Sequence, residues 1–350
     1  MSSLLTRSQR GVTDVGSAPG KRVPPSLIEI GIPVVVFGAL VLVLPTFVPS
    51  YVSSLVTKMM IYGLFGMSLN ILWGYTGIPS FGHAAFFGAG GYATGLLALK
   101  LGITNFWLNM LLALLITAAI AAILGVPAFR VFGVGAGAAN PIYFLLATIA
   151  FGELLSRVAI YARQYTGGST GLKGIPQPQL GFGFTVDSGH FYYLVFIVVA
   201  IAVFVIYRIV NSHYGYGLRG IHDNEKRMQA LGYNTWLYKY TAWIIAAVFG
   251  GLAGLLFAYF NGTMVPAHLA MITSDIAFLL VIMGSTTTFF GPLVASVLYV
   301  GVEHLASQYL PERWPLIFGA MFVITIMVIP QGLGVFILKT WRRIIRGAAA

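Results

Sequence analysis

Long apolar segments follow one another along most of this 350-residue chain, and they constrain its fold more than any other feature. A helix needs about 20 mostly apolar residues to cross the hydrocarbon core of a bilayer. Ten segments fit, although the third and the eighth are short. They cover residues 27–48, 54–73, 83–100, 106–129, 140–162, 191–210, 238–260, 273–285, 287–309 and 314–336. The sequence therefore predicts an all-α integral membrane protein with about ten transmembrane helices.

The composition excludes most soluble classes of protein. Hydrophobic residues make up 58% of the chain and charged residues only 8%, whereas about 25% of an ordinary soluble domain is charged. A soluble globule, a disordered chain or a nucleic-acid module would need far more polar surface. The chain has no cysteine, which excludes disulfides, thiolate metal sites and a thiol nucleophile.

Basic residues set the predicted orientation, because cytoplasmic loops of membrane proteins are enriched in lysine and arginine. They gather in a polar N-terminal tail (1–26), in the connection at 211–237 and in a C-terminal tail (337–350). Placing all three inside requires an even number of spans, and ten satisfies this. We therefore expect cytoplasmic termini, a disordered first tail, one transmembrane domain at 27–336 and an outside connection at 163–190.

Ionisable side chains are scarce within the predicted spans, and this bears on mechanism. Pumps and ion-coupled carriers usually place charged residues inside the membrane. Glu153 and Arg157 lie one helical turn apart, so we expect an internal ion pair that fixes helix packing or, alternatively, contacts a substrate. Four other charged residues lie near predicted span ends, where they can reach the headgroups: Lys58, Lys100, Asp275 and Glu303. No proton relay is evident, which argues against a secondary transporter.

The sequence lacks the motifs of a metal site and of an ATP-binding site. The six histidines are scattered without metal-ligand spacing, so no metal site is expected. No P-loop motif occurs, so ATP-driven work would need a partner subunit. The sequence also offers no clustered catalytic set for a membrane enzyme, and no catalytic residue is predicted.

Glycine and proline interrupt the apolar pattern in the run Gly74-Tyr-Thr-Gly-Ile-Pro-Ser-Phe-Gly-His83. Non-helical backbone survives at membrane depth only where protein buries it or where it lines a cavity. The run therefore predicts an interrupted helix beside a translocation path. The alternative is a short loop followed by a glycine-rich helix with close neighbours.

Two connections carry polar motifs. The outside one contains Thr166-Gly-Gly-Ser-Thr-Gly-Leu-Lys-Gly-Ile-Pro176, which could bind an anion, dock a soluble partner or form a flexible turn. In the inside one, at 219–232, Asp223 or Asn224 can begin a short helix that Gly232 ends. This helix is expected either to press against another protein or to lie on the membrane surface.

These three motifs, in this order, resemble the membrane permease subunit of branched-chain amino acid ABC importers. The run at 74–88 looks like that family's hallmark, 166–176 is similar to a second signature, and 219–232 resembles the loop that docks on the ATPase. The resemblance covers about residues 50–340. It implies the permease fold of these importers and a place in the bacterial inner membrane.

The chain departs from the family pattern in two places. In the coupling loop, His222, Arg227 and Met228 stand where the family usually has arginine and small residues. Around 284–290 the family is usually richer in glycine, so this joint is expected to differ. Permeases for urea, short-chain amides and aromatic or other small carboxylates share the signatures, which leaves these solutes open as alternative substrates.

The resemblance implies several partners. They are a second permease subunit, two cytoplasmic ATPases that hold ATP and magnesium, and a periplasmic substrate-binding protein. This chain would then bind no cofactor and catalyse no chemical reaction. An ion-coupled carrier or channel remains the alternative of another class.

The resemblance also implies roles for individual residues. Those expected near the substrate path are Tyr75, Thr76, Ser80 and His83. Those of the periplasmic loop are Thr166, Gly167, Gly168, Ser169, Thr170, Gly171 and Lys173. Those expected to couple to the ATPase are Arg219, Asp223, Asn224, Glu225 and Gly232.

Overall fold

The computed structural model describes residues 49–131, 141–181, 188–309, 314–328, 331–336 and 340. The predicted first span and the predicted tails, apart from Thr340, lie outside these residues. The long helices are α2 (Ser50–Thr76), α3 (Ala84–Lys100), α4 (Phe106–Val131), α5 (Pro141–Tyr161), α7 (Ser188–Val210), α10 (Thr235–Asn261), α11 (Met271–Gly284), α12 (Gly291–Tyr309) and α13 (Trp314–Val328). The short elements are α6 (Arg163–Thr166), η1 (Gly168–Thr170), β1 (Leu172–Lys173), α8 (His213–Asp223), α9 (Glu225–Ala230), β2 (Thr263–Met264) and η2 (Pro266–His268).

Each predicted span within the described part of the chain coincides with one of the long helices. Six stretches there are long and apolar enough to cross a membrane: Ser50–Thr76, Phe106–Arg130, Tyr143–Tyr161, His190–Val210, Thr235–Asn261 and Pro266–Gly284. These helices support an all-α protein that crosses the membrane several times. The total of about ten spans and the cytoplasmic termini stay predictions.

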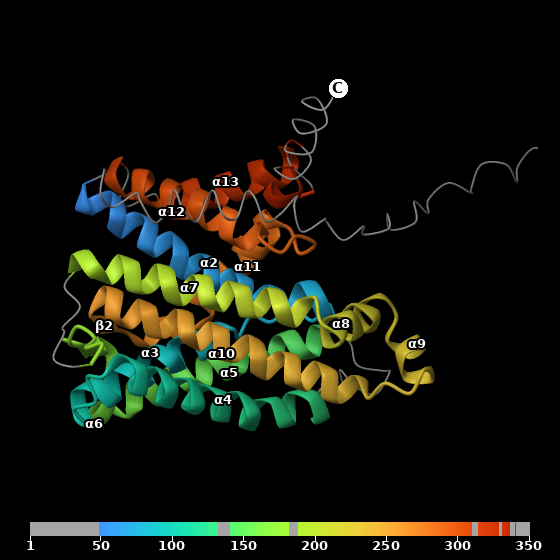
Figure 1. Ribbon diagram of the computed structural model, residues 1–350, viewed down its shortest axis with the longest axis horizontal. Coiled ribbons are helices and arrows are strands. Elements are labelled where there is room, and N and C mark those ends of the chain that lie inside the picture. The colour runs from blue at the N-terminus through green and yellow to red at the C-terminus, as the bar shows by residue number, and fades with distance from the viewer. Residues whose placement is uncertain are drawn as a thin grey trace, which may run out of the picture. The chain divides into compact units, whose positions relative to one another are not determined.

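Helices α2 and α10 form the centre of the bundle. Both are buried over most of their length, including the large side chains Phe65 and Trp243. Helix α4 instead exposes a stripe of leucines on its outer face, which suits contact with lipid tails. In Figure 1, α2, α7, α10 and α4 run side by side along the long axis of the view.

Close glycine contacts join α3 to α10. A Cβ atom on Gly254 would lie 1.7 Å from the Phe87 carbonyl oxygen, and one on Gly90 would lie 2.1 Å from the Gly251 carbonyl oxygen. Small residues permit such backbone approach in membrane bundles, where lipid supplies no hydrophobic driving force between helices. The glycine-rich helix with close neighbours, expected as one of two alternatives for this run, is therefore present.

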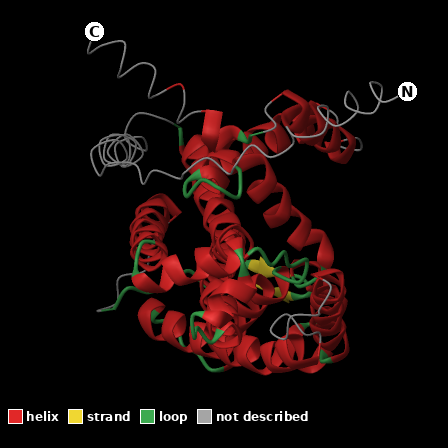
Figure 2. Cartoon of the chain, turned by 90° about the vertical axis from the view of Figure 1, so that its right-hand side faces the viewer, coloured by secondary structure: helices red, strands yellow, loops and turns green. Residues whose placement is uncertain are grey.

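The two polar connections lie at opposite ends of the bundle. Helices α8 and α9 occupy the right-hand end in Figure 1, and α6 and β2 occupy the left-hand end. Strand β1 pairs antiparallel with β2, with Leu172 opposite Met264 and Lys173 opposite Thr263. Figure 2 shows these short strands beside the helices. This arrangement agrees with connections on opposite sides of a membrane, as the basic residues predict.

The Gly254→Ala variant tests the crossing of α3 and α10. The added methyl group forces the helices apart, so we expect a loss of about 1–3 kcal/mol of stability. Thermal unfolding of the detergent-extracted protein measures this loss. Gly301→Ala on α12 is the matched control, because a Cβ there meets nothing within 4 Å. Equal melting temperatures for the two variants would contradict the proposed role of the crossing.

Candidate functional site

The chain breaks its helix after Thr76 and folds back into the bundle. Gly77 ends α2 with φ +76°, and its N–H donates to the Trp73 carbonyl at 2.9 Å. Six residues later, the His83 ring contacts the Ser68 hydroxyl at 2.8 Å (Nε2 to Oγ). Ser68 lies eight residues before the end of α2, about 12 Å back along the helix at about 1.5 Å per residue. Helix α3 therefore starts inside the bundle, after non-helical backbone.

The residues expected near the substrate path are enclosed at this break. Tyr75, Thr76, Ser80 and His83 are all buried. The Thr76 hydroxyl donates to the Leu72 carbonyl within α2. Ser80 Oγ and His83 Nδ1 have no hydrogen-bond partner among the described residues. The structure thus gathers the four residues around the fold-back, and their contact with a substrate stays a prediction.

A second fold-back enters the bundle after α10. Residues 262–270 carry β2 and η2, and Leu269 packs on Gly88, where an added Cβ would lie 2.4 Å from Leu269 Cδ2. The Ala84 N–H then donates to Ser274 Oγ at 2.8 Å. The starts of α3 and α11 therefore meet in the interior of the bundle, a contact that no sequence pattern indicated.

Glu153 of α5 contacts this second fold-back. Its Oε1 accepts a hydrogen bond from the Met271 N–H at 3.3 Å, and the neighbouring Ser156 hydroxyl donates to the Pro266 carbonyl at 3.1 Å. A carboxylate is favourable at a helix N-terminus, where unsatisfied N–H groups carry partial positive charge. Glu153 and Arg157, both within the described chain, form no ion pair, so the predicted pair is wrong.

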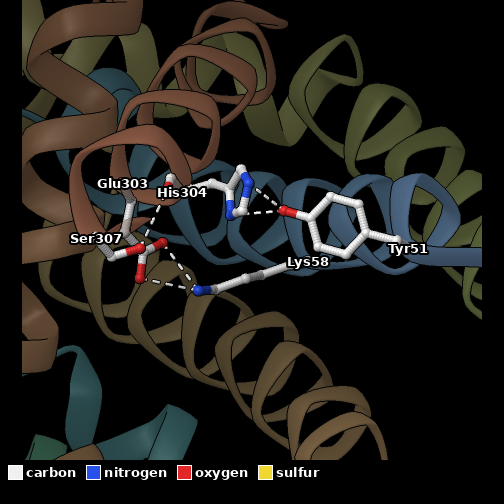
Figure 3. A network of polar contacts seen from close by, with 5 residues as sticks. All are labelled: Tyr51, Lys58, Glu303, His304 and Ser307. Atoms are coloured by element: carbon white, nitrogen blue, oxygen red, sulfur yellow. Dashed lines mark hydrogen bonds and ion pairs between the residues drawn. The ribbon is translucent and has the colours of Figure 1, made fainter. Parts of the chain in front are cut away.

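Lys58 and Glu303 pair with each other in the first half of α2 and near the end of α12, although each was expected to extend toward the headgroups. Lys58 Nζ lies 2.9 Å from both carboxylate oxygens of Glu303. Nearby, the Tyr51 hydroxyl contacts the His304 ring, and the Ser307 hydroxyl donates to the His304 carbonyl (Figure 3). These contacts tie the start of α2 to the end of α12.

The predicted coupling segment sits on the broken end of α2. The Arg219 guanidinium lies 5.2 Å from the centre of the Tyr75 ring and donates to the Val210 carbonyl at 2.9 Å. The His222 ring packs on Gly77, where a Cβ would lie 2.5 Å from its Cδ2. Two motifs about 140 residues apart in the sequence, one that breaks a helix and one that lies at the surface, are thus in contact.

Helix α8 is also held to α10. The Tyr214 hydroxyl donates to the Tyr238 carbonyl at 3.0 Å and bonds Thr241 at 2.8 Å. Burial raises the pKa of Tyr214 to about 12, so its hydroxyl keeps its proton at neutral pH. Helix α8 is therefore attached by side-chain contacts to both central helices, α2 and α10.

The start of α9 matches the sequence prediction. Asn224 caps the helix, because its side-chain oxygen accepts from the Arg227 N–H at 2.9 Å. Gly232 follows the helix with φ +86°. Asp223 is exposed, at 78% of its side-chain surface.

Glu225 faces inward, whereas the resemblance implied contact with an ATPase. Its Oε1 lies 2.6 Å from Lys239 Nζ, and the Lys239 side chain is only 5% exposed. The pair attaches α9 to α10, and a buried ammonium requires such a partner. The structure therefore gives Glu225 an internal role in holding the segment, and its direct contact with an ATPase stays a prediction.

The outside motif forms a defined turn. Gly167, Gly168 and Gly171 all have positive φ, and a Cβ on Gly171 would lie 2.1 Å from the Met264 carbonyl oxygen. The buried Thr166 hydroxyl donates to the Ala162 carbonyl at 2.9 Å. The exposed side chains of the motif are Ser169, Thr170 and Lys173. Its glycines serve the local fold, which leaves these three available to a partner.

The joint between α11 and α12 packs beside the break in α2. Ser285 adopts φ +84°, a conformation that favours glycine and strains other residues. The Asn70 side chain donates to the Thr288 carbonyl at 3.3 Å, and a Cβ on Gly74 would lie 2.5 Å from the Thr286 carbonyl oxygen. The expected difference of this joint from the family's glycine-rich pattern stays a prediction.

The Glu225→Gln variant tests the attachment of α9. Lys239 then loses its carboxylate partner while it remains buried, and we expect a loss of about 1–3 kcal/mol of stability. Thermal unfolding and protease cleavage at 224–232 measure the effect. Asp223→Asn is the control, because the Asp223 side chain is exposed. A Glu225→Gln protein as stable and as protease-resistant as the control would refute the attachment.

Comparisons with known proteins identify the family to which this chain is similar. The family described as "Branched-chain amino acid transport system / permease component" matches residues 51–326. A high-affinity branched-chain amino acid transport system permease protein, LivM, of Salmonella typhimurium is 29% identical over 300 residues, which are 79% of this chain and 68% of that protein. The LivH protein of the same system in that organism is 21% identical over 286 residues, 78% of this chain and 90% of LivH.

A more distant organism also carries a similar protein. The probable branched-chain amino acid transport permease LivM of Methanocaldococcus jannaschii is 24% identical over 276 residues, 71% of this chain and 79% of that protein. No solved structure matches the chain. Within the described residues, no group of histidines and carboxylates could hold a metal ion. Because the family match spans most of the sequence and nearly all of the described helices, this multi-pass membrane chain belongs to the permease components of branched-chain amino acid transport systems.

Proposed function

We propose that this chain is one of two permease subunits of an ATP-driven importer that moves branched-chain amino acids across the inner membrane. The observation that carries the proposal is the family match over residues 51–326. The chain is similar to both LivM and LivH, whose names describe permease proteins of one transport system. This pairing supports a second, related permease subunit beside this chain.

The other partners follow from the energetics of import. The chain has no P-loop, so two cytoplasmic ATPases would bind ATP and magnesium. A periplasmic binding protein would deliver the substrate to the outside turn, where Ser169, Thr170 and Lys173 are exposed. The permease then needs no tight site of its own, because the binding protein supplies the affinity.

The proposed coupling runs from α9 to the interior of the bundle. Closure of the ATPases would press on the exposed Asp223 and its neighbours. Helix α8 would pass this movement to α2 through Arg219 on Tyr75 and His222 on Gly77. The fold-back at 77–83 would then shift the start of α3, where His83 contacts Ser68. Such a movement would switch access to the path between the two sides.

Uptake of labelled leucine tests the proposed function. The measurement uses vesicles that hold this chain with its co-encoded subunits, with benzoate and urea as competitors. We expect leucine uptake that requires ATP and is blocked by neither competitor. ATP-dependent uptake that one competitor blocks would keep the importer and change its substrate. Uptake without ATP or an ATPase subunit would favour the ion-coupled carrier or channel and overturn the proposal.

The Asp223→Ala variant tests the coupling surface. Asp223 is exposed and ends α8, so its loss should spare folding. We expect transport and substrate-stimulated ATP hydrolysis to fall about tenfold, as for a docking contact of about 1.4 kcal/mol, while the subunits still assemble. Lys100→Ala is the control, because Lys100 is exposed at the opposite end of the bundle. Full transport by the Asp223→Ala complex would remove Asp223 from the coupling surface.

A further inference from the structure

Asp275 lies near the start of α11, as the sequence predicted near a span end, but α11 itself starts at the depth of the middle of α2. Its neighbour Ser274 accepts the Ala84 N–H at 2.8 Å, and the adjacent His83 contacts Ser68. Ser68 is about 27 Å from the start of α2 and about 12 Å from its end, at about 1.5 Å per residue. The short aspartate side chain therefore cannot reach the headgroups from this depth as a lysine can.

Asp275 lies on the face of α11 that the described chain leaves uncovered. Thr273, Ser274, Ala277 and Leu280 are buried against other helices, and the opposite face carries Asp275 with Ile272 and Leu279. Ile272 is 68% exposed, and Asp275 is partly exposed. A carboxylate that faced lipid at this depth would be costly, so intramembrane acids normally face a partner or a water-filled cavity.

Asp275 differs from the other acidic side chains that the structure describes within the membrane helices. Glu303 pairs with Lys58, and Glu153 accepts a hydrogen bond from the start of α11. Asp275 has no ion pair and no hydrogen bond with any described residue. Its charge is therefore left for a group from outside this part of the chain.

An aromatic stack lies about one helical turn along α11 from Asp275. Phe278, three residues further along α11, stacks between Trp73 and Phe81, with ring centres 4.3 Å and 4.1 Å away. All three side chains are partly exposed. Trp73 and Phe81 flank the fold-back that the sequence predicts beside a path. An anionic group one helical turn from apolar, cation-attracting rings suits a ligand with an ammonium group and an aliphatic side chain.

We propose that Asp275 and the stack of Trp73, Phe278 and Phe81 form a wall of the translocation path, and that Asp275 binds the α-ammonium group of the passing amino acid. The proposal rests on the function proposed above and adds a residue that discriminates amino acids from uncharged solutes. A single charge-assisted contact favours entry of the ammonium group and still permits its release.

Cysteine labelling tests whether Asp275 faces an aqueous path. The chain has no cysteine, so D275C carries its one thiol. The complete importer in proteoliposomes is treated with a trimethylammonium methanethiosulfonate reagent, and labelling of this chain is read by mass. We expect D275C to be labelled and leucine with the binding protein to slow the reaction. I201C on α7 is the control, because Ile201 is 55% exposed on an apolar helix face. A D275C chain as unreactive as I201C would overturn the proposal.

Uptake by two variants tests the role of the charge. D275N should lower leucine uptake about 10- to 100-fold, as expected for loss of a charge-assisted hydrogen bond, while ATP hydrolysis without substrate and subunit assembly persist. D275E should restore part of the uptake. Unchanged uptake by D275N would overturn the proposal, and so would loss of the second permease subunit, which would assign Asp275 to the subunit interface.

The wild-type importer separates this inference from the proposed function. If wild-type vesicles take up no leucine with ATP, the proposed function fails irrespective of Asp275. If they take up leucine and D275N does so equally well, only the inference fails. ATP-driven transport of urea in place of leucine would also overturn the inference, because urea has no ammonium group.

Discussion

Backbone amides and carbonyls inside a membrane must find partners within the protein, because lipid offers none. Two segments of this chain, 77–83 and 262–270, bring non-helical backbone into the bundle and face this constraint together. Side chains supply part of the solution: Ser274 accepts the Ala84 N–H, Glu153 accepts the Met271 N–H, and Ser156 donates to a carbonyl of the second segment. Polar groups are thus concentrated where α3 and α11 begin.

Glycine makes this concentration sterically possible. A Cβ on Gly82 would lie 1.9 Å from the Thr148 carbonyl oxygen, and one on Gly254 would lie 1.7 Å from that of Phe87. Such contacts bring helices close enough for short serine and threonine side chains to reach backbone across the interface. The glycine content of 74–91 therefore reflects close packing as well as the break in the helix. The same glycine contacts join α3, which follows the break, to α10. The inside connection leads into the start of α10.

The sequence predicted helices more successfully than contacts. An apolar run in lipid has few alternatives to a helix, so the span predicted at 191–210 corresponds closely to Ser188–Val210. The span predicted at 287–309 begins late, at Gly291, because the strained joint around Ser285 precedes it. Charged pairs were harder to foresee. Lys58 and Glu303 lie 245 residues apart, and no periodic pattern indicates which charges two distant helices bring together.

The three residues of the coupling segment that depart from the family pattern, His222, Arg227 and Met228, pack in different ways. His222 packs inward on Gly77, and Met228 is buried against Gly220, where a Cβ would lie 2.7 Å from its sulfur. Met228 is therefore withdrawn from a partner's surface, whereas about a third of the His222 side chain stays exposed. Arg227 is exposed, so Arg227 and the exposed part of His222 are the departures that could adapt the segment to the proposed ATPase. His222 also holds α8 against α2, and Met228 holds α9 against α8, so both would affect how much of the proposed movement reaches the fold-back. In the proposed mechanism, selectivity for the partner and transmission of movement would thus depend on two sets of side chains that overlap at His222.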